Sequence, residues 1–183
     1  MKKLLLPILG LFLFITSCEK DDPDIPNEEE LITTVRYQLT PAGGGTMVEL
    51  SYTDLDGDGG NAPVIVNGVL DANTTYTGNM ILLNEQESPA EDIAEEVLEE
   101  GVDHQFFFTS TSTDLSVAYA DQDNNGDAIG LASTVTTLAA GNAELTIVLR
   151  HEPNKAASGV AGGDITNAGG ETDIEVTFDV TIQ

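Results

Sequence analysis

Apolar and polar residues alternate with a period of two along most of the chain from residue 31 onward. The clearest early case is residues 35–39, where Val35, Tyr37 and Leu39 are separated by Arg36 and Gln38. This alternation is typical of a strand with one buried face and one exposed face. The same pattern predicts nine strands, over residues 35–39, 48–52, 63–70, 75–83, 103–110, 114–120, 131–138, 143–151 and 173–182.

Short strands separated by regular turn residues indicate a single all-β domain. We expect residues 31–183 to form an immunoglobulin-like antiparallel β-sandwich. Half of this region, about 70 residues without a disulfide, would be only marginally stable alone, so we expect one shared core and not two separate domains.

Two parts of this region align with an offset of 67 residues and no gap. The aligned positions include Tyr52 with Tyr119, Asp54 with Asp121, Asp56 with Asp123, Gly59 with Gly126, Leu82 with Leu149 and Glu85 with Glu152. This repeat predicts a duplicated four-strand unit, to which residues 173–182 add a ninth strand.

One short helix is predicted between the two units. Ser88–Glu91 has the form of a capping box with proline at the first helical position, and Gly101 is a stop signal. Ile93, Val97 and Leu98 form a narrow apolar stripe, while the opposite face carries acidic pairs four residues apart, which repel each other. The segment is therefore either a solvated connector or a binding helix held by packing or cations.

Residues 1–17 have the features of a secretory signal peptide. Lys2 and Lys3 are followed by the apolar run Leu4–Ile15. That run is too short to span a bilayer, which takes about 20 residues. We therefore expect this segment to be removed.

The stretch Ile15-Thr16-Ser17-Cys18 resembles the lipobox of bacterial lipoproteins. The resemblance implies that Cys18 carries a thioether-linked diacylglycerol and an acylated amino group, which would anchor the protein in a membrane. The alternative is a stray cysteine in an ordinary signal peptide. Cys18 is the only cysteine, so the sequence contains no disulfide framework and no second thiol.

Residues 18–30 are predicted to be a lipidated, disordered, acidic tether. Residues 19–30 contain Pro23, Pro26 and seven acids, a composition too polar to bury a core. Glu19–Asp24 also resembles the short acidic tag of surface lipoproteins in flavobacterial-type bacteria. It implies lipid anchoring in the outer membrane, exposed at the cell surface if the tag is read and facing the periplasm otherwise.

The charge of the chain excludes one class of partner. All 32 acids and four of the six basic residues lie after residue 17, which leaves a formal charge of −28. Such a surface repels phosphate backbones, so we expect no nucleic-acid partner. It attracts divalent cations.

Two loops have the spacing of a calcium half-motif. Asp54–Gly59 and Asp121–Gly126 both read D-x-D-x-[DN]-G, which supplies the oxygen ligands that Ca²⁺ prefers and a glycine for the turn. Neither loop has the glutamate of an EF-hand at its twelfth position, so they resemble repeat-type calcium loops. The alternative is a simple turn, which the same residues favour. The candidate ligands are Asp54, Asp56, Asp58, Asp121, Asp123 and Asn125.

No active site stands out. His104 and His151 are isolated in separate strands, and we expect structural roles, since a catalytic dyad would need a nucleophile or carboxylate brought near by folding. The acids are too numerous for one catalytic pair to be singled out. We do not expect an enzyme.

Seven stretches together look like a family of small, uncharacterised flavobacterial-type lipoproteins: "NEEELITTV", "DLDGDGGNAPV", "ANTTYTG", "LLNEQESPAEDIAEEV", "HQFFFT", "VLRHEPNK" and "GGETDIEVTF". Members are often labelled "type 1 periplasmic binding fold superfamily protein", a name that implies alternating strands and helices. Our leading hypothesis is a non-enzymatic surface module, an acylated sandwich on a tether that presents loops to a glycan or protein partner and is stabilised by calcium if the two loops bind it. The alternatives are an accessory lipoprotein of an outer-membrane uptake or secretion complex and, more remotely, a hydrolase.

Overall fold

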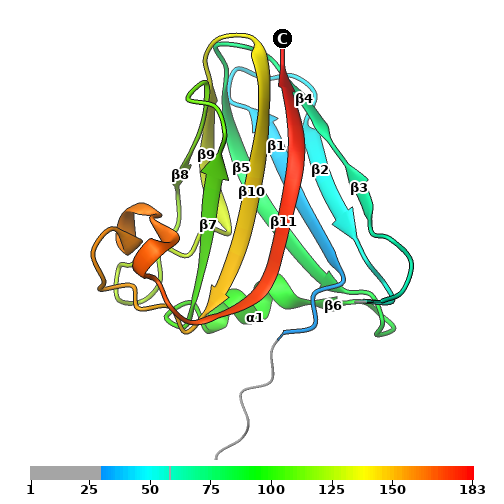
Figure 1. Ribbon diagram of the computed structural model, residues 1–183, viewed down its shortest axis with the longest axis vertical. Helices are drawn as coiled ribbons and strands as arrows, with labels where there is room; N and C mark the ends of the chain where they lie inside the picture. The colour runs from blue at the N-terminus through cyan, green and yellow to red at the C-terminus, as the bar shows by residue number, and fades with distance from the viewer. Residues whose placement is uncertain (1–29, 58) are drawn as a thin grey trace, which may run out of the picture.

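The computed structural model describes residues 30–57 and 59–183. These residues form two β-sheets packed face to face, with a short α-helix across one end (Figure 1). The predicted all-β sandwich is confirmed. The predicted signal peptide, Cys18, the tether up to residue 29, and Asp58 lie outside the described residues.

The first sheet has the strand order β3-β2-β1-β5-β9-β8, and β6 pairs with β5. Its strands are β1 (Thr34–Pro41), β2 (Val48–Thr53), β3 (Val64–Val66), β5 (Thr75–Asn84), β6 (Glu91–Asp92), β8 (Leu115–Tyr119) and β9 (Ala132–Thr137). The second sheet has the order β4-β11-β10-β7. Its strands are β4 (Gly68–Leu70), β7 (His104–Ser110), β10 (Gly141–His151) and β11 (Glu171–Ile182).

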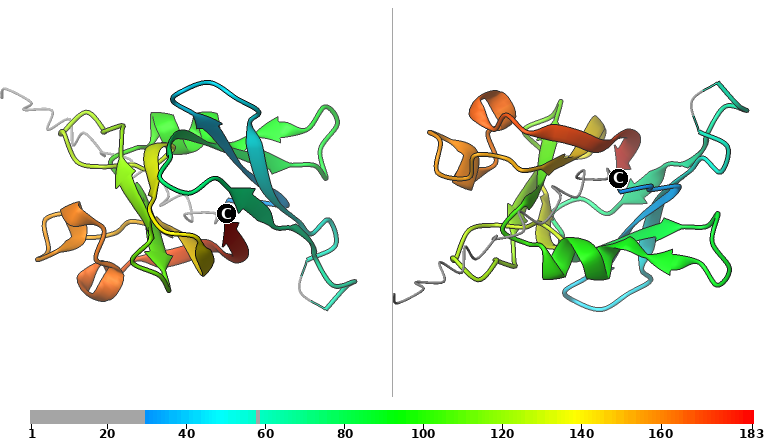
Figure 2. Two further views of the ribbon diagram at one scale, coloured as in Figure 1. Left: turned by 90° about the horizontal axis from the view of Figure 1, so that it is seen from above. Right: turned by 90° about the horizontal axis from the view of Figure 1, so that it is seen from below.

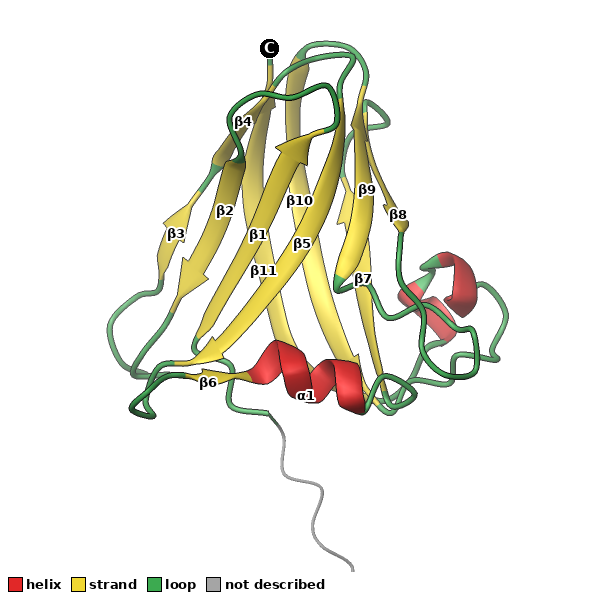
Figure 3. Ribbon diagram, turned by 180° about the vertical axis from the view of Figure 1, so that it is seen from behind, coloured by secondary structure: helices red, strands yellow, loops and turns green. Residues whose placement is uncertain are grey.

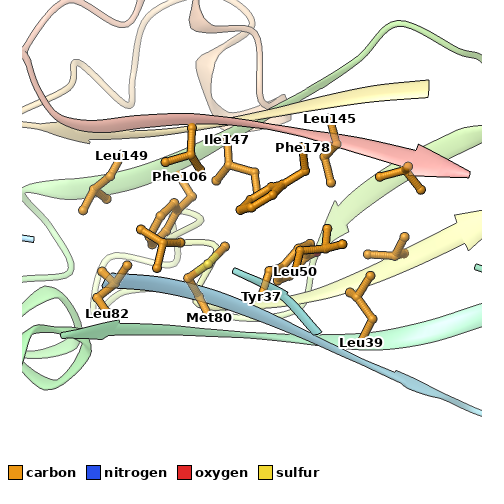
Figure 4. Close-up of a cluster of buried hydrophobic side chains, with 14 of the residues drawn as sticks. Tyr37, Leu39, Leu50, Met80, Leu82, Phe106, Leu145, Ile147, Leu149 and Phe178 are labelled. Atoms are coloured by element: carbon orange, nitrogen blue, oxygen red, sulfur yellow. The ribbon is translucent and has the colours of Figure 1, made fainter. Parts of the chain in front are cut away.

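The core lies between the two sheets and consists of the inward-facing residues that the alternation predicts. Tyr37, Leu50 and Leu82 of the first sheet point toward residues such as Phe106 and Phe178 of the second (Figure 4). Burying each such side chain contributes roughly 1.5–3 kcal/mol to stability. The alternation therefore fixes which face of each strand enters the core.

A second, smaller apolar cluster lies on the outer face of the second sheet. Phe107 and Val148 pack there against Val160 and Ala168, which belong to the segment carrying the 3₁₀ helices η1 (Val160–Gly162) and η2 (Ile165–Asn167). Figure 2 shows this segment beside β7 and β10, on the side away from the first sheet. Because this segment covers the outer face of β7 and β10, both faces of these strands are buried there, and consecutive residues are buried.

The predicted strand over residues 63–70 is two strands, which lie in different sheets. The chain leaves the first sheet after β3, and β4 then joins β11 in parallel, so the sandwich is not purely antiparallel as expected. Asn67 stabilises the segment between β3 and β4. Its side-chain oxygen accepts a hydrogen bond from the backbone N–H of Asp179, and its NH₂ group donates one to the carboxylate of Asp179. With the two-residue β6, this division gives eleven described strands where nine were predicted.

The predicted duplication is visible in two strand pairs. β1 pairs with β5 as β7 pairs with β10, and β2 pairs with β3 as β8 pairs with β9. The hairpin of β1 and β2 has no counterpart, because β7 and β8 lie in different sheets. The two units therefore have two strand pairings in common, but their strands are distributed differently between the two sheets.

The helix α1 (Ile93–Glu99) begins later than the capping box predicts. Asp92 is its N-cap and accepts a hydrogen bond from the backbone N–H of Ala94 at 3.1 Å. Glu91 and Asp92 pair with the end of β5, and that pairing overrides the local helix signal at Ser88. Ile93 and Val97 are buried, whereas Leu98 is exposed.

The helix lies across the end of the sandwich at which β1 begins (Figure 3). We call this end, marked by α1 and β6, the base. In the part of the chain that the structure describes, no helix has the length and apolar character needed to cross a membrane.

Candidate functional site

Four segments bring two histidines and two acids together at the base. His104 begins β7 and His151 ends β10, and the register of these strands places the two residues directly opposite each other. Glu30 comes from the segment that precedes β1, and Asp173 comes from the start of β11. We call Glu30, His104, His151 and Asp173 the His/acid cluster.

A β-bulge in β11 sets the position of Asp173. The register pairs Leu149 with Ile174 but Arg150 with Thr172, so Asp173 is an inserted residue in β11. Bulges of this kind redirect a side chain out of the regular alternation. Here the side chain of Asp173 is fully buried and lies beside His104.

The cluster is compact. Nε2 of His104 lies 2.9 Å from Nδ1 of His151, 3.6 Å from Oε1 of Glu30 and 3.8 Å from Oδ2 of Asp173. The side chain of His104 is 0% exposed and that of Glu30 is 8% exposed. Within residues 30–57 and 59–183, Glu30, His104 and His151 form the single group of three or more His, Cys, Asp or Glu ligand atoms that could surround one metal ion.

The hydrogen bonds of His104 define which of its nitrogens carries a proton. Nδ1 lies 3.2 Å from the backbone carbonyl of Glu100. A carbonyl oxygen can only accept, so Nδ1 is the donor. Burial lowers the pKa of His104 and so favours the neutral ring, although the Glu100 carbonyl acts in the opposite direction. In that neutral form Nε2 is an acceptor, and Nδ1 of His151, 2.9 Å away, donates a hydrogen bond to it.

The carboxylates of the cluster are placed at an electrostatic cost. Burial, reinforced by the negative charges of Asp173, Glu96 and Glu100, raises the pKa of Glu30 to about 7, and His151 offsets part of this effect. Oε2 of Glu30 has no hydrogen-bond partner in the described structure. Buried carboxylates of this kind require a proton or a cation nearby.

A cleft of about 460 Å³ opens beside the cluster and is bordered by Glu30, Asp173, Tyr52, Asp54 and Gln86, among other residues. The cleft connects the cluster to the first predicted calcium loop, because Asp54 of that loop lines it together with Glu30 and Asp173. Its wall contains both polar and apolar atoms, with the polar ones in modest excess.

The first calcium loop uses its described carboxylates to shape a turn. Asp54 accepts a hydrogen bond from the backbone N–H of Gly57 at 2.9 Å. Asp56 accepts bonds from both the backbone and the side-chain amide of Asn61, which lower the pKa of Asp56. The third candidate ligand, Asp58, lies outside the described residues. Calcium binding by this loop remains a prediction.

The second loop directs its two carboxylates to different partners. Asp121 accepts hydrogen bonds from the backbone N–H groups of Gly130 and Ala132. One oxygen of Asp123 accepts bonds from the N–H groups of Asn125 and Asp127. The side chain of Asn125 is exposed, and this residue contributes its backbone N–H to the turn.

The other oxygen of Asp123 binds the ammonium group of Lys155 at 2.9 Å. The ammonium also donates to the backbone carbonyls of Gly101 at 2.5 Å and Ala128 at 3.0 Å. Burial would raise the pKa of Asp123, but the bonds from Lys155 and the backbone hold it below its usual value. Three oxygens, one of them from this loop, therefore bind a positive charge that the chain itself supplies.

Sequence reasoning treated the histidines as isolated and did not single out Lys155. The sequence contained an indication that each of these residues could have a partner. His104 and His151 lie at ends of predicted strands that could pair, and Lys155 is one of four basic residues after residue 17. The partners of these residues could not be assigned, because they are separated by 47 and 32 positions along the chain.

Comparison with known proteins identifies no relative. No protein-family model matches the chain, and no curated protein matches it. Among solved structures the chain is similar to one described as "Crystal structure of the S-layer protein SbsC domains 4 and 5", at 15% sequence identity over 80% of this chain and 75% of that chain. The TM-score is 0.30, too low to transfer a fold or a function.

Proposed function

We propose that this protein is a lipid-anchored, non-enzymatic module of the outer-membrane surface with a binding or structural role. The lipobox ending at Cys18 and the acidic tether after it support the anchor. The observation that carries the proposal is the direction of the sandwich. The described chain starts at the base, whereas Gln183 bonds to Leu70 and Ala72 at the opposite, distal end (Figure 1).

This direction gives the two ends of the sandwich different roles. An anchor on the N-terminal side would hold the base toward the membrane and present the distal loops outward. The base carries the acidic helix α1, where partial burial and the neighbouring charges of Glu91, Glu100 and Glu99 raise the pKa of Glu96. Anionic headgroups would repel such a surface, so the domain would stand away from the membrane.

The surface favours a protein or structural partner over a glycan. Each described Phe and Tyr is buried or half-buried, so the sandwich offers no exposed ring on which a sugar could stack. The two histidines are buried as well, which argues against a role in binding and turning over a substrate.

Lipid attachment is tested by replacing Cys18 with serine in cells fed a clickable fatty acid. We expect label on the wild-type protein and none on Cys18→Ser, together with loss of the protein from the membrane fraction. On intact cells, added protease should digest the wild-type sandwich. An unlabelled wild-type protein would contradict the anchor, and protection from protease would place the module on the periplasmic side.

A second candidate role, as an accessory lipoprotein of an uptake or secretion complex, is favoured by the edge of the first sheet. Val64, Ile65 and Val66 of the edge strand β3 are 65%, 45% and 50% exposed. An exposed apolar edge strand is a surface on which a partner protein can pair.

Crosslinking and co-purification from membranes test this second role. Ile65→Lys should abolish co-purification of a partner, whereas Leu138→Lys, an exposed apolar position directly after β9, should not. Equal recovery with both variants would exclude the β3 edge as the contact.

A further inference from the structure

The His/acid cluster directs several electron-pair donors toward one point. With Nδ1 of His104 donating to the Glu100 carbonyl, a neutral His104 directs the lone pair of Nε2 into the cluster. Carboxylate oxygens of Glu30 and Asp173 lie 3.6 Å and 3.8 Å from that nitrogen. Such groups in a buried space are stabilised by protons, as in the hydrogen bond between the two histidine rings, or by a metal ion that takes the place of those protons.

The spacing of these atoms fits a single small ion. In a tetrahedral site with bonds of 2.0–2.1 Å, adjacent ligand atoms lie about 3.3 Å apart. The three distances from Nε2 of His104 are 2.9 Å to His151, 3.6 Å to Glu30 and 3.8 Å to Asp173. They lie on both sides of the ideal value, so small shifts of the side chains would complete the site.

We propose that Glu30, His104 and His151 form a binding site for one divalent transition-metal ion, with Asp173 beside it and with Zn²⁺ as the expected occupant. Imidazole nitrogens suit Zn²⁺, whereas Ca²⁺ and Mg²⁺ prefer oxygen ligands alone. Asp173, whose Oδ2 lies 3.8 Å from Nε2 of His104, adds negative charge beside these three ligands. The bond from Nδ1 of His104 to a backbone carbonyl is the usual outer contact of a metal-binding histidine.

The ion would have a structural effect. Its ligands come from the segment before β1, which leads into the first sheet, and from β7 and β10 of the second sheet, with Asp173 of β11 beside them. Binding would therefore join the two sheets at the base and hold the segment through which the chain enters the domain. If the protein is anchored as proposed above, this is where the tether meets the sandwich, but the metal site itself does not depend on the anchor.

The test is a zinc titration of the purified full-length chain after removal of metals with a chelator. We expect one Zn²⁺ per chain by elemental analysis, and a melting temperature that rises by about 5–10 °C at a hundredfold excess over Kd. Glu30→Gln and His151→Gln should each weaken zinc binding by more than roughly tenfold, which is the lower range for losing even an outer contact of a metal. Glu144→Gln, an exposed position on β10, is the matched control and should bind as the wild type does.

Several outcomes would overturn the proposal. They are a chain that retains no Zn²⁺, a melting temperature that responds to pH but not to zinc or chelator, and zinc affinity that is equal in Glu30→Gln and Glu144→Gln. If a variant fails to fold, Co²⁺ bound to the wild type provides a second measurement, since a four-coordinate site gives strong visible absorption that Zn²⁺ abolishes. Absence of this absorption also counts against the site. The Cys18→Ser variant should bind zinc normally, so failure of the anchor and failure of the metal site are distinguishable.

Discussion

At the scale of single residues, the buried pair of Lys155 and Asp123 differs sharply from the surface pair of Arg36 and Glu85. The side chains of the first pair are 6% and 1% exposed, and those of the second are 41% and 29% exposed. Removing one partner of a buried pair leaves an unpaired charge without water, which costs about 3–5 kcal/mol. Exposed pairs contribute only about 0–1 kcal/mol.

We therefore expect Lys155→Met to lower the free energy of unfolding by about 3–5 kcal/mol, because Asp123 and the carbonyls of Gly101 and Ala128 lose their donor. Arg36→Met is the control and should cost at most about 1 kcal/mol. Urea denaturation measures both. A small and equal effect of the two substitutions would show that the buried pair adds no stability.

The same pair predicts a pH dependence. The folded state holds the pKa of Asp123 below its usual value, so the stabilisation is present above the unfolded pKa of about 3.9 and is lost as the pH falls through the lower folded pKa. The difference in stability between the wild type and Lys155→Met should therefore shrink below about pH 4. Denaturation at several pH values checks this. A difference that stays constant down to pH 2 would contradict it.

The two calcium loops should respond differently to calcium. If the first loop binds Ca²⁺, calcium raises the melting temperature and Asp56→Asn abolishes the rise. Asp123→Asn should leave the calcium response unchanged, because that carboxylate binds Lys155. These measurements are made in the Glu30→Gln variant, so that metal binding by the His/acid cluster does not affect the melting temperature. A melting temperature that ignores both calcium and chelator would identify the first loop as a simple turn.

At the scale of elements, the crossing from β3 to β4 depends on Gly68. A Cβ atom at this position would lie 2.2 Å from Cδ2 of Leu50, in the core. No side chain larger than hydrogen therefore fits without displacing Leu50. The close approach lets the chain pass from the edge of one sheet to the edge of the other.

We expect Gly68→Ala to cost about 1–3 kcal/mol of unfolding free energy through overpacking. Gly141→Ala, at the first residue of β10, has no atom within 4 Å of the added Cβ and should change stability by no more than about 0.5 kcal/mol. Chemical denaturation compares the two. Equal stability of both variants would mean that Leu50 moves aside freely.

At the scale of the whole molecule, the excess of acids over bases opposes the compact state. The 32 acids after residue 17 face four basic residues, and one of those four, Lys155, is buried. Salt screens repulsion between exposed charges. We expect the melting temperature to rise by a few degrees between low and moderate NaCl concentration, with a neutral osmolyte at equal osmolality as the control. A melting temperature that falls with salt would contradict this.

The sequence supports accurate predictions where the physical cause is local. Eight of the nine predicted strands form within two residues of their expected bounds, because alternation decides which side chains enter the core. The predictions were wrong at the helix start and in residues 63–70. In each case a pairing with a distant strand, β5 or β11, outweighed the local signal.

By itself, then, the sequence determined the β-sandwich class, the buried face of most strands and the excess negative charge. These follow from composition and from contacts between near neighbours. Only the tertiary structure decided that His104 meets His151, that Glu30 and Asp173 join them, and that Lys155 binds Asp123. The physical reason is that strand register and a single bulge determine these meetings, and both depend on how the whole core packs.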